Sequence, residues 1–266
     1  MIRGLYTAAF GMIENQTRQD VTANNIANSE TTGYKEDKIV DREFPEVMLQ
    51  NEYSNGLGRD VHKLGSMPFG VTGEGPYTDF KQGASVETGR KLDFAIEGRG
   101  FFPVRYFDGI TDSIKYTRDG SFNLDGEGNV VTSEGGFPLA RDAATGEIVP
   151  MKLAGNEIKV DSHGNVFVDS QLKYTLVIDD FNDYNSLSKY GKNMYDIKQG
   201  SGAAAYEITD GTSQVVQGRL EQSNVDMNSQ ITDMIVNLRR YQANQRVLNS
   251  IDETLDKTIN EVGTVK

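Results

Sequence analysis

Cysteine is absent from this 266-residue chain. Its absence excludes disulfide bonds, thiol nucleophiles and cysteine-ligated zinc sites. A chain without thiols is compatible with an extracytoplasmic destination that requires no oxidative folding. The length allows one large domain or two small ones, each with a sizeable core.

Basic residues are few: 27 Lys and Arg stand against 39 Asp and Glu, which gives a formal net charge of -12. Nucleic-acid binding in general depends on Lys and Arg that neutralise phosphates, and anionic membranes attract polybasic segments. The composition therefore argues against a nucleic-acid partner and against a polybasic membrane contact.

Long apolar runs are also missing, since no segment approaches the roughly 18 residues of a membrane-spanning helix. The N-terminal sequence MIRGLYTAAFGMIENQ lacks the uninterrupted apolar core of a signal peptide and reaches Glu14 early. We therefore expect no direct membrane insertion. Export, where it occurs, is expected to follow a route without a cleaved signal peptide.

The negative charge is concentrated in the middle of the chain. Residues 1–29 are neutral, and residues 219–266 hold six basic and seven acidic side chains. The neutral ends can pack closely without self-repulsion, while the acidic middle keeps the particle in solution.

The N-terminal segment has the periodicity of one face of a helix, with apolar residues at steps of three and four. We expect an assembly helix within residues 1–30 that ends in the Asn-rich stretch 24–28. Gly4 and Gly11 weaken this helix locally. The apolar positions of the helix are Ile2, Leu5, Ala9, Met12 and Ile26.

The C-terminal segment has the same rhythm over a longer range, which predicts a second assembly helix within residues 227–266. From 227 to 262 it would be roughly 54 Å long at 1.5 Å per residue. Its length favours a coiled coil with partners over a stripe packed on its own domain, which remains the alternative. The predicted interface positions are Ile231, Met234, Leu238, Tyr241, Leu248, Ile251 and Leu255.

Between the helices the sequence is typical of strands and turns, so the predicted fold class is α+β. We expect an extended connector over 31–92 with short strands at most, a β-rich domain over 93–200 and a return segment over 201–226. Within the β-rich domain the pattern D-x-x-G-N occurs at Asp125 and again at Asp161. Both copies predict tight hairpin turns rather than calcium loops, because the acidic residue at loop position 12 is missing.

No cluster predicts catalysis, a metal or a cofactor. The acidic stretch around Asp180 is interpreted as a solvated strand end, although paired carboxylates can perform glycosidic acid–base chemistry. His62 and His163 are the histidines of the chain, and both lie in polar, glycine-rich contexts typical of surface loops. Catalytic, metal and cofactor residues are therefore expected to be none, as is a small-molecule substrate.

Four blocks of sequence, in order along nearly the whole chain, resemble the flagellar basal-body rod and hook family of axial proteins. They are A-N-N-I-A-N with T-G-Y-K, then L-D-F-A-I-E-G-R-G-F-F, then Y-T-R-D-G-S-F, then L-E-Q-S-N-V with M-I-V-N-L-R-R-Y. The stretch 231–241 is most similar to a rod subunit of the FlgF type, with the FlgG type next. The motif residues are Asn24, Asn25, Asn28, Gly33, Tyr34, Gly98, Gly100, Phe101, Arg118, Gly120, Ser223 and Asn224.

This resemblance implies that the terminal helices form an inner coiled-coil layer around an export channel, with the β-rich domain outside. It also implies export through the flagellar type III apparatus, and partners that are copies of the chain and other rod or hook proteins. The leading hypothesis is a structural rod subunit that transmits torque from motor to hook and is not an enzyme. The alternatives are a hook-type subunit and a secreted β-rich glycan-binding or hydrolytic module, which would have a concave site with a perturbed carboxylate near Asp180 or Asp119.

Overall fold

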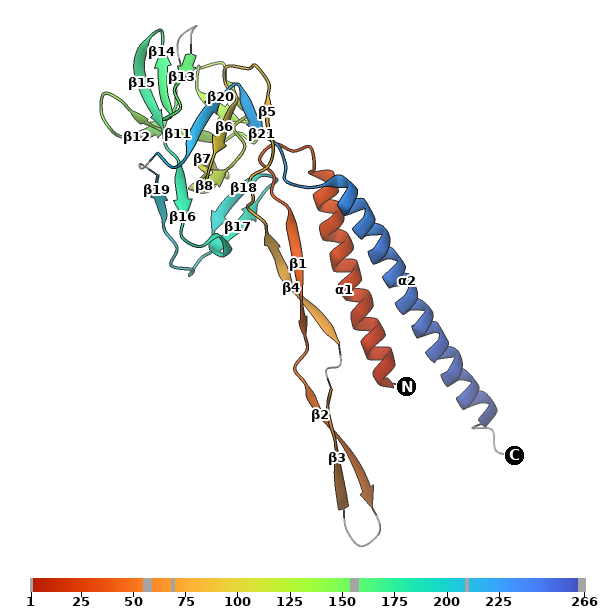
Figure 1. Ribbon diagram of the computed structural model, residues 1–266. Helices are drawn as coiled ribbons and strands as arrows, with labels where there is room; N and C mark the ends of the chain where they lie inside the picture. The colour runs from red at the N-terminus through yellow and green to blue at the C-terminus, as the bar shows by residue number, and fades with distance from the viewer. Residues whose placement is uncertain (1, 55–58, 68–69, 154–157, 209–210, 263–266) are drawn as a thin grey trace. The chain divides into compact units, whose positions relative to one another are not determined.

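The structure is a computed structural model that describes residues 2–54, 59–67, 70–153, 158–208 and 211–262. The chain divides into two compact units. Unit 1 contains Met1–Ile26, Asp37–Tyr77 and Met227–Lys266, and unit 2 contains Ala27–Glu36 and Thr78–Asp226. Terminal helices, strands and a β-rich middle confirm the predicted α+β class (Figure 1).

Unit 1 combines the two long helices with paired strands. Helix α1 spans Ile2–Ala27 and α2 spans Met227–Lys257, followed by the π-helical turn η2 (Thr258–Val262). The predicted N-terminal helix is therefore confirmed, and the regular part of the C-terminal helix stops at Lys257. Among the described helices, none is both long and apolar enough to cross a membrane.

The predicted connector contains longer strands than the sequence suggested. Strand β1 (Asp37–Glu43) pairs with β4 (Val71–Thr78), and β2 (Val47–Ser54) pairs antiparallel with β3 (Arg59–Met67). The expectation of short strands at most is wrong, since β2, β3 and β4 have 8, 9 and 8 residues. Frequent glycine and polar residues hid these strands, because their sequences contain no regular alternation of apolar residues.

Unit 2 is built on a nine-stranded sheet. Eight of its strands follow the order β13-β14-β15-β11-β7-β8-β18-β17, and the ninth, β12, pairs with β11. Two-strand pairs surround this sheet: β9–β10, β16–β19, β6–β20 and β5–β21. The sheet strands are β7 (Phe102–Phe107), β8 (Asp112–Thr117), β11 (Phe137–Asp142), β12 (Ile148–Pro150), β13 (Ile158–Val160), β14 (Asn165–Val168), β15 (Gln171–Leu176), β17 (Leu187–Tyr190) and β18 (Met194–Ile197).

The remaining elements of unit 2 are short, and several pairs join segments that lie far apart in the sequence. The return segment, for example, places β20 against β6 and β21 against β5. The elements are β5 (Ser85–Glu87), β6 (Phe94–Glu97), β9 (Phe122–Leu124), β10 (Val130–Thr132), β16 (Asp179–Phe181), η1 (Tyr184–Ser186), β19 (Ala205–Glu207), β20 (Gln214–Gln217) and β21 (Arg219–Glu221).

Both D-x-x-G-N repeats form the predicted hairpin turns. The first joins β9 to β10, and the second joins β13 to β14. In each turn the Asp amide donates to the Asn carbonyl at 3.0 Å, and the glycine has a positive φ of about 80°. The Asp125 carboxylate also accepts hydrogen bonds from the backbone of Glu127 and Asn129. Its oxygens therefore close the turn.

The core of unit 2 has two parts. The larger part is aliphatic and aromatic, and it includes Phe94, Phe122 and Val166. The smaller part is a cluster of rings built by Phe101, Phe181 and Tyr195 with their neighbours. Phe101 packs against Phe181 and Tyr195 with ring centroids 5.8 and 5.6 Å apart, within the range of favourable aromatic pairs.

Candidate functional site

The two terminal helices of unit 1 lie side by side and run antiparallel. A Cβ added at Gly4 would lie 3.4 Å from Ile251 Cδ1, and one at Gly11 would lie 2.7 Å from Asn244 Nδ2. Asn25 Nδ2 donates to Gln230 Oε1 at 3.2 Å. In all three contacts the two residue numbers add up to 255. The helices therefore share one register over their common length, and Gly11 leaves room for the Asn244 side chain of α2.

Burial along α2 follows the heptad spacing of a helix packed on one side. Its less exposed positions are Gln230, Met234, Asn237, Tyr241, Asn244, Leu248, Ile251 and Leu255. Within this seam the fully buried side chains are the amides Gln230 and Asn237. The recorded contacts between the helices are those of Gly4 with Ile251, Gly11 with Asn244 and Asn25 with Gln230. They do not establish the knobs-into-holes packing of a coiled coil, so the predicted coiled coil is not confirmed.

The predicted interface residues fall on more than one face of the helices. On α2, Met234, Tyr241, Leu248, Ile251 and Leu255 are half-buried in the seam. Ile231 and Leu238 are 43 % and 42 % exposed. On α1, the half-buried members of the predicted set are Leu5, Ala9, Met12 and Ile26, while the side chain of Ile2 lies outside the described residues.

Helix α1 also packs against the strands of unit 1. The rings of Phe10 and Phe44 lie 4.9 Å apart, and Arg18 pairs with Asp41. The motif residue Asn25 is buried and joins three elements. Besides its bond to Gln230, its amide donates to the Asp37 carbonyl at 2.8 Å, and its carbonyl accepts from the Asp37 amide at 3.1 Å. The motif residue Asn24 is exposed on α1.

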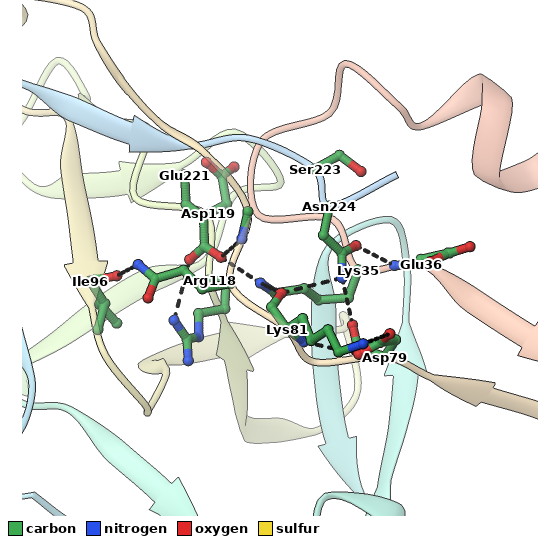
Figure 2. Close-up of polar contacts among 12 residues, drawn as sticks. Lys35, Glu36, Asp79, Lys81, Ile96, Arg118, Asp119, Glu221, Ser223 and Asn224 are labelled. Atoms are coloured by element: carbon green, nitrogen blue, oxygen red, sulfur yellow. Dashed lines mark hydrogen bonds and ion pairs between the residues drawn. The ribbon is translucent and has the colours of Figure 1, made fainter. Parts of the chain in front are cut away.

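In unit 2, motif residues from three blocks meet at the buried carboxylate of Glu221 (Figure 2). Lys35 Nζ forms an ion pair with Glu221 Oε1, and Arg118 Nη1 lies 3.3 Å from Glu221 Oε2. The Gly83 amide donates to Oε1 at 2.9 Å. The two cations and the anion lie away from water, and burial lowers the pKa of Lys35 despite the attraction of Glu221. We call these three side chains the Glu221 cluster.

Asn224 holds the same region through its amide group, as Figure 2 shows. Its Oδ1 accepts from the Glu36 amide at 2.8 Å, and its Nδ2 donates to the Asp79 carbonyl at 2.8 Å. Ser223 makes a local turn, in which its Oγ accepts from the Val225 amide. Asn224 therefore joins the residue that precedes β1 to the residue that follows β4.

The Asp119 carboxylate organises a second polar group in unit 2. Thr32 Oγ1 donates to Oδ1 at 2.7 Å, and Asn193 Nδ2 donates to Oδ2 at 2.9 Å. Gly33, with φ +68°, approaches so closely that an added Cβ would lie 2.4 Å from the Asp119 nitrogen. An added Cβ on Gly120 would lie 1.8 Å from the Phe94 oxygen. These motif glycines are thus required by close backbone packing.

The other motif residues are also structural. The Asn28 carboxamide accepts from Thr31, and Tyr34 is buried below the Lys189 ammonium at 3.9 Å from the ring centroid. Gly98 and Gly100 have φ values of +116° and +111°, which open the turn between β6 and β7 and place the buried Phe101.

The acidic stretch around Asp180 is not a solvated strand end, because Asp180 is buried. Its carboxylate accepts from the hydroxyls of Tyr184 at 2.7 Å and Tyr206 at 3.0 Å, and it lies 3.2 Å from Arg99 Nε. Burial, and then the neighbouring charge of Glu207, raise the pKa of Asp179 to about 6. The Asp180 side chain lines a cavity of about 490 Å³.

The sequence predicted that both histidines lie in surface loops and that the chain has no metal site. His163 is exposed and lies 3.5 Å from Asp161, as expected of a surface loop. The side chain of His62 lies outside the described residues. Within the described part of the chain, no group of three His, Asp or Glu side chains is arranged to hold a metal ion.

Three features of these sites were not anticipated. Lys35 and Glu221 pair across 186 sequence positions. Lys189 and Asn193, from outside every motif block, complete the contacts to Tyr34 and Asp119. The sequence does show charged residues inside motif blocks that are otherwise apolar or rich in glycine, and such residues are candidates for buried ion pairs. A single sequence does not show which distant residue each of them pairs with.

Three protein-family models match this chain, one at each end and one in the middle. Residues 5–35 match the family model described as flagella basal body rod protein, and residues 95–168 match the D1 domain of the flagellar hook protein FlgE/F/G. Residues 216–261 match the C-terminal model of flagellar basal body rod FlgEFG proteins.

Relatives that align with nearly the whole chain are also flagellar basal-body proteins. The chain is 32 % identical to the flagellar basal-body rod protein FlgG of Bacillus subtilis, over 98 % of this chain and 99 % of that protein. It is 33 % identical to FlgG of Agrobacterium fabrum, over 95 % and 96 %. It is also 30 % identical to the flagellar hook-basal body complex protein FlhO of Bacillus subtilis, over the full length of both.

Proposed function

Because the chain belongs to the flagellar basal-body rod protein family and is a structural subunit of the rod, we propose that its terminal helices carry the assembly and that the assembled chain transmits torque from motor to hook. The relatives support the FlgG type, which the sequence-based interpretation ranked after the FlgF type. Rod and hook proteins are its partners, as family membership indicates.

Exposed apolar side chains on both helices are the observation that carries this proposal. Tyr6 and Ile13 on α1 are 53 % and 60 % exposed, and Ile231 and Leu238 on α2 are also open to solvent. Complete burial of an exposed apolar side chain is worth roughly 1.5–3 kcal/mol, and about half of that remains available for these half-exposed side chains. A lone chain leaves them in water, so subunits gain from docking into a growing array. An array of heterologous contacts extends as an open helix.

The five predicted segments have distinct roles in this proposal. Residues 1–30 and 227–266 contact neighbouring subunits. The motif residues near these helices hold the segments that connect them to the rest of the chain. Residues 31–92 and 201–226 connect, and 93–200 form the outer β-rich body. The subunit leaves the cytoplasm through the flagellar type III export apparatus without a cleaved signal peptide, and it resides in the extracytoplasmic basal body.

The proposal is tested by placing a charge on the exposed helix face. Ile231→Asp in the full chain should leave the melting temperature within about 2 °C of the parent, because the side chain is not part of a core. It should abolish motility and remove the subunit from purified basal bodies, because assembly would bury the charge. The control is Ile114→Asp on β8, a position of similar exposure in unit 2.

The control should retain rods. Motile cells with normal rods that contain the Ile231→Asp subunit would contradict an assembly role for the helices. Loss of rods from both variants alike would also contradict a role specific to the helices.

A hydrolytic or glycan-binding module is less well supported. The cavity beside Asp180 and the raised pKa of Asp179 are the features that this alternative requires. However, the Asp180 carboxylate is engaged by two tyrosine hydroxyls and a guanidinium, which leaves it poorly placed to exchange a proton with a substrate. We therefore assign Asp180 the structural role of joining β16, η1 and β19.

A further inference from the structure

The last part of unit 2 in the sequence pairs with its earlier parts. Residues 213–224, which we call the closing segment, contain β20 and β21. Strand β20 pairs with β6, and β21 pairs with β5 (Figure 1). The Gly33 amide donates to the Glu221 carbonyl at 2.9 Å, and the Val215 amide donates to the Ser162 carbonyl at 3.1 Å. The closing segment therefore joins the beginning, the middle and the end of unit 2.

Strand β6 depends on the closing segment for its strand pairing. Its residues Phe94, Ala95 and Ile96 are at most 1 % exposed. Among the strands that the structure describes, β20 is the one paired with β6. Without β20, the backbone groups of β6 that face it would be buried without partners, which is unfavourable. We therefore expect β6 to enter the core together with the closing segment and not before it.

Two side chains of the closing segment complete the interior of unit 2. Val215 is 2 % exposed and belongs to the larger core. Glu221 supplies the carboxylate that pairs with Lys35 and Arg118. With the closing segment displaced, the core lacks a side chain and two cations lack their anion, so a folded interior is unfavourable.

The Gln217 side chain of β20 binds two further segments. Its Nε2 donates to the Lys91 carbonyl at 2.7 Å and to the Ile158 carbonyl at 3.1 Å. Its Oε1 accepts from the Val160 amide at 3.0 Å. One amide group therefore holds the approach to β6 and the edge strand β13 against the closing segment.

Many other pairings of unit 2 join strands that follow one another in the sequence. They are β7 with β8, β9 with β10, β13 with β14, β14 with β15, and β17 with β18. Contacts between neighbours in the sequence form fast, because they close short loops, whereas contacts between distant segments form late. The hairpins can thus form early, and the pairings of the closing segment come last.

We propose that unit 2 closes in one cooperative step that requires the closing segment, and that it stays open while this segment is absent. The inference goes beyond the rod function and does not depend on it. Synthesis starts at the N-terminus, so residues 1–212 leave the ribosome before the closing segment. A chain that stops before residue 224 never closes unit 2, and open chains are degraded by proteases. A closed unit 2 is therefore the mark of a nearly complete chain.

The competing arrangement is a strap that lies on a body already closed without it. A strap of this kind opens alone, at a lower free energy than the body beneath it. A cooperative closing segment opens only when the whole of unit 2 opens. Hydrogen exchange of the full chain under native conditions separates the two arrangements, because it reports opening one amide at a time.

The measurement compares amides of the closing segment with amides of the core. Val215 and Gly218 report on the closing segment, and Val130 and Leu153, which donate to the carbonyls of Met151 and Gly128, report on the core. The protection factors of all four should agree within about tenfold, because one opening event exposes them.

Gly146 provides the control in the same sample. Its amide donates to the Asp142 carbonyl in the exposed turn between β11 and β12, and it should be at least about a hundredfold less protected than Val130. Protection of Val215 and Gly218 more than about tenfold below that of Val130 and Leu153 would show that the closing segment opens alone. That result would overturn the proposal and leave the rod function, which Ile231→Asp tests, untouched.

A pair of glutamine variants tests the same coupling from the closing segment outward. Gln217→Ala leaves three buried backbone groups without their partner, so protection at Val130 and Leu153 should fall by at least about tenfold, in step with Val215. Gln214→Ala is the matched control on the same strand, and its exposed side chain should change protection less than about twofold. A Gln217→Ala chain that loses protection in the closing segment alone, or nowhere, would overturn the proposal.

Discussion

Units 1 and 2 differ most in what they bury. The described helices of unit 1 bury one apolar side chain, Ala8, together with amides and threonine. Unit 2 buries a continuous set of aliphatic and aromatic side chains. The difference indicates that unit 2 obtains its stability from its own core, whereas much of the apolar surface of the unit 1 helices stays exposed, as the proposed assembly role requires.

Charged groups show the same contrast. In unit 1 the pair of Arg42 with Glu74 lies largely in solvent, where a pair contributes roughly 0–1 kcal/mol, and Arg18 with Glu14 and Asp41 is only partly buried. The Glu221 cluster of unit 2 is removed from water, so each member depends on the others. Three comparisons of variants test how far this contrast extends.

The largest effect is expected for Glu221→Gln. A neutral side chain leaves Lys35 and Arg118 buried without an anion, which should lower the free energy of unfolding by about 3–5 kcal/mol. Urea titration followed by circular dichroism measures the change. Glu97→Gln is the control, since Glu97 pairs with Arg219 at 3.8 Å while both side chains are nearly half exposed. Equal losses of unfolding free energy from both variants would show that the buried Glu221 cluster contributes no more to stability than an exposed ion pair.

A glycine comparison should give intermediate effects. In Gly120→Ala the new Cβ would meet a backbone oxygen of Phe94, so we expect a loss of more than about 2 kcal/mol. In Gly11→Ala the new Cβ meets the end of the Asn244 side chain, which can rotate away. Alanine also favours the helix by about 1 kcal/mol, so this change should stay within about 1 kcal/mol.

Gly126→Ala serves as the control for the glycine comparison, because nothing lies within 4 Å of its added Cβ. The same urea titration applies to all three variants. A larger loss from Gly11→Ala than from Gly120→Ala would reverse the contrast between the units.

The smallest effect is expected for Asp179→Asn and depends on pH. The pKa of Asp179 in the folded chain, about 6, exceeds its ordinary value of 3.8, so folding favours the protonated form. Its stabilising contribution is complete below pH 3.8 and is lost as the pH rises through 6. Because the Asp179 side chain is partly open to solvent, only part of this difference should appear as stability. The neutral variant should therefore melt near the parent temperature at pH 4 and roughly 2–4 °C higher at pH 7, which corresponds to about 1 kcal/mol.

Melting curves of parent and variant across that range provide the measurement. Glu127→Gln, an exposed carboxylate variant, should run parallel to the parent at every pH. A variant of Asp179 that also runs parallel would show that burial of Asp179 does not matter for stability.

Much of the local structure was accessible from the sequence. The apolar steps of three and four predicted α1 and the regular part of α2, and the D-x-x-G-N repeats predicted two hairpins that formed as expected. The strands β1 to β4 were underestimated, because their sequences contain no regular alternation of apolar residues. The solvated interpretation of Asp180 failed for a related reason, since its burial depends on tyrosines 4 and 26 positions away.

By itself, therefore, the sequence determined the features that depend on residues close together in the chain. These are the periodicity of the helices, the turns of the two hairpins and the motif blocks that identify the family. Only the tertiary structure decided which charges lose their water and what neutralises them, as in the pairing of Lys35 with Glu221. It also decided that the apolar positions of the helices divide between a seam, which they share with buried amides, and exposed faces. The physical reason is that burial and register arise from contacts between distant segments, and no local pattern records which segments meet.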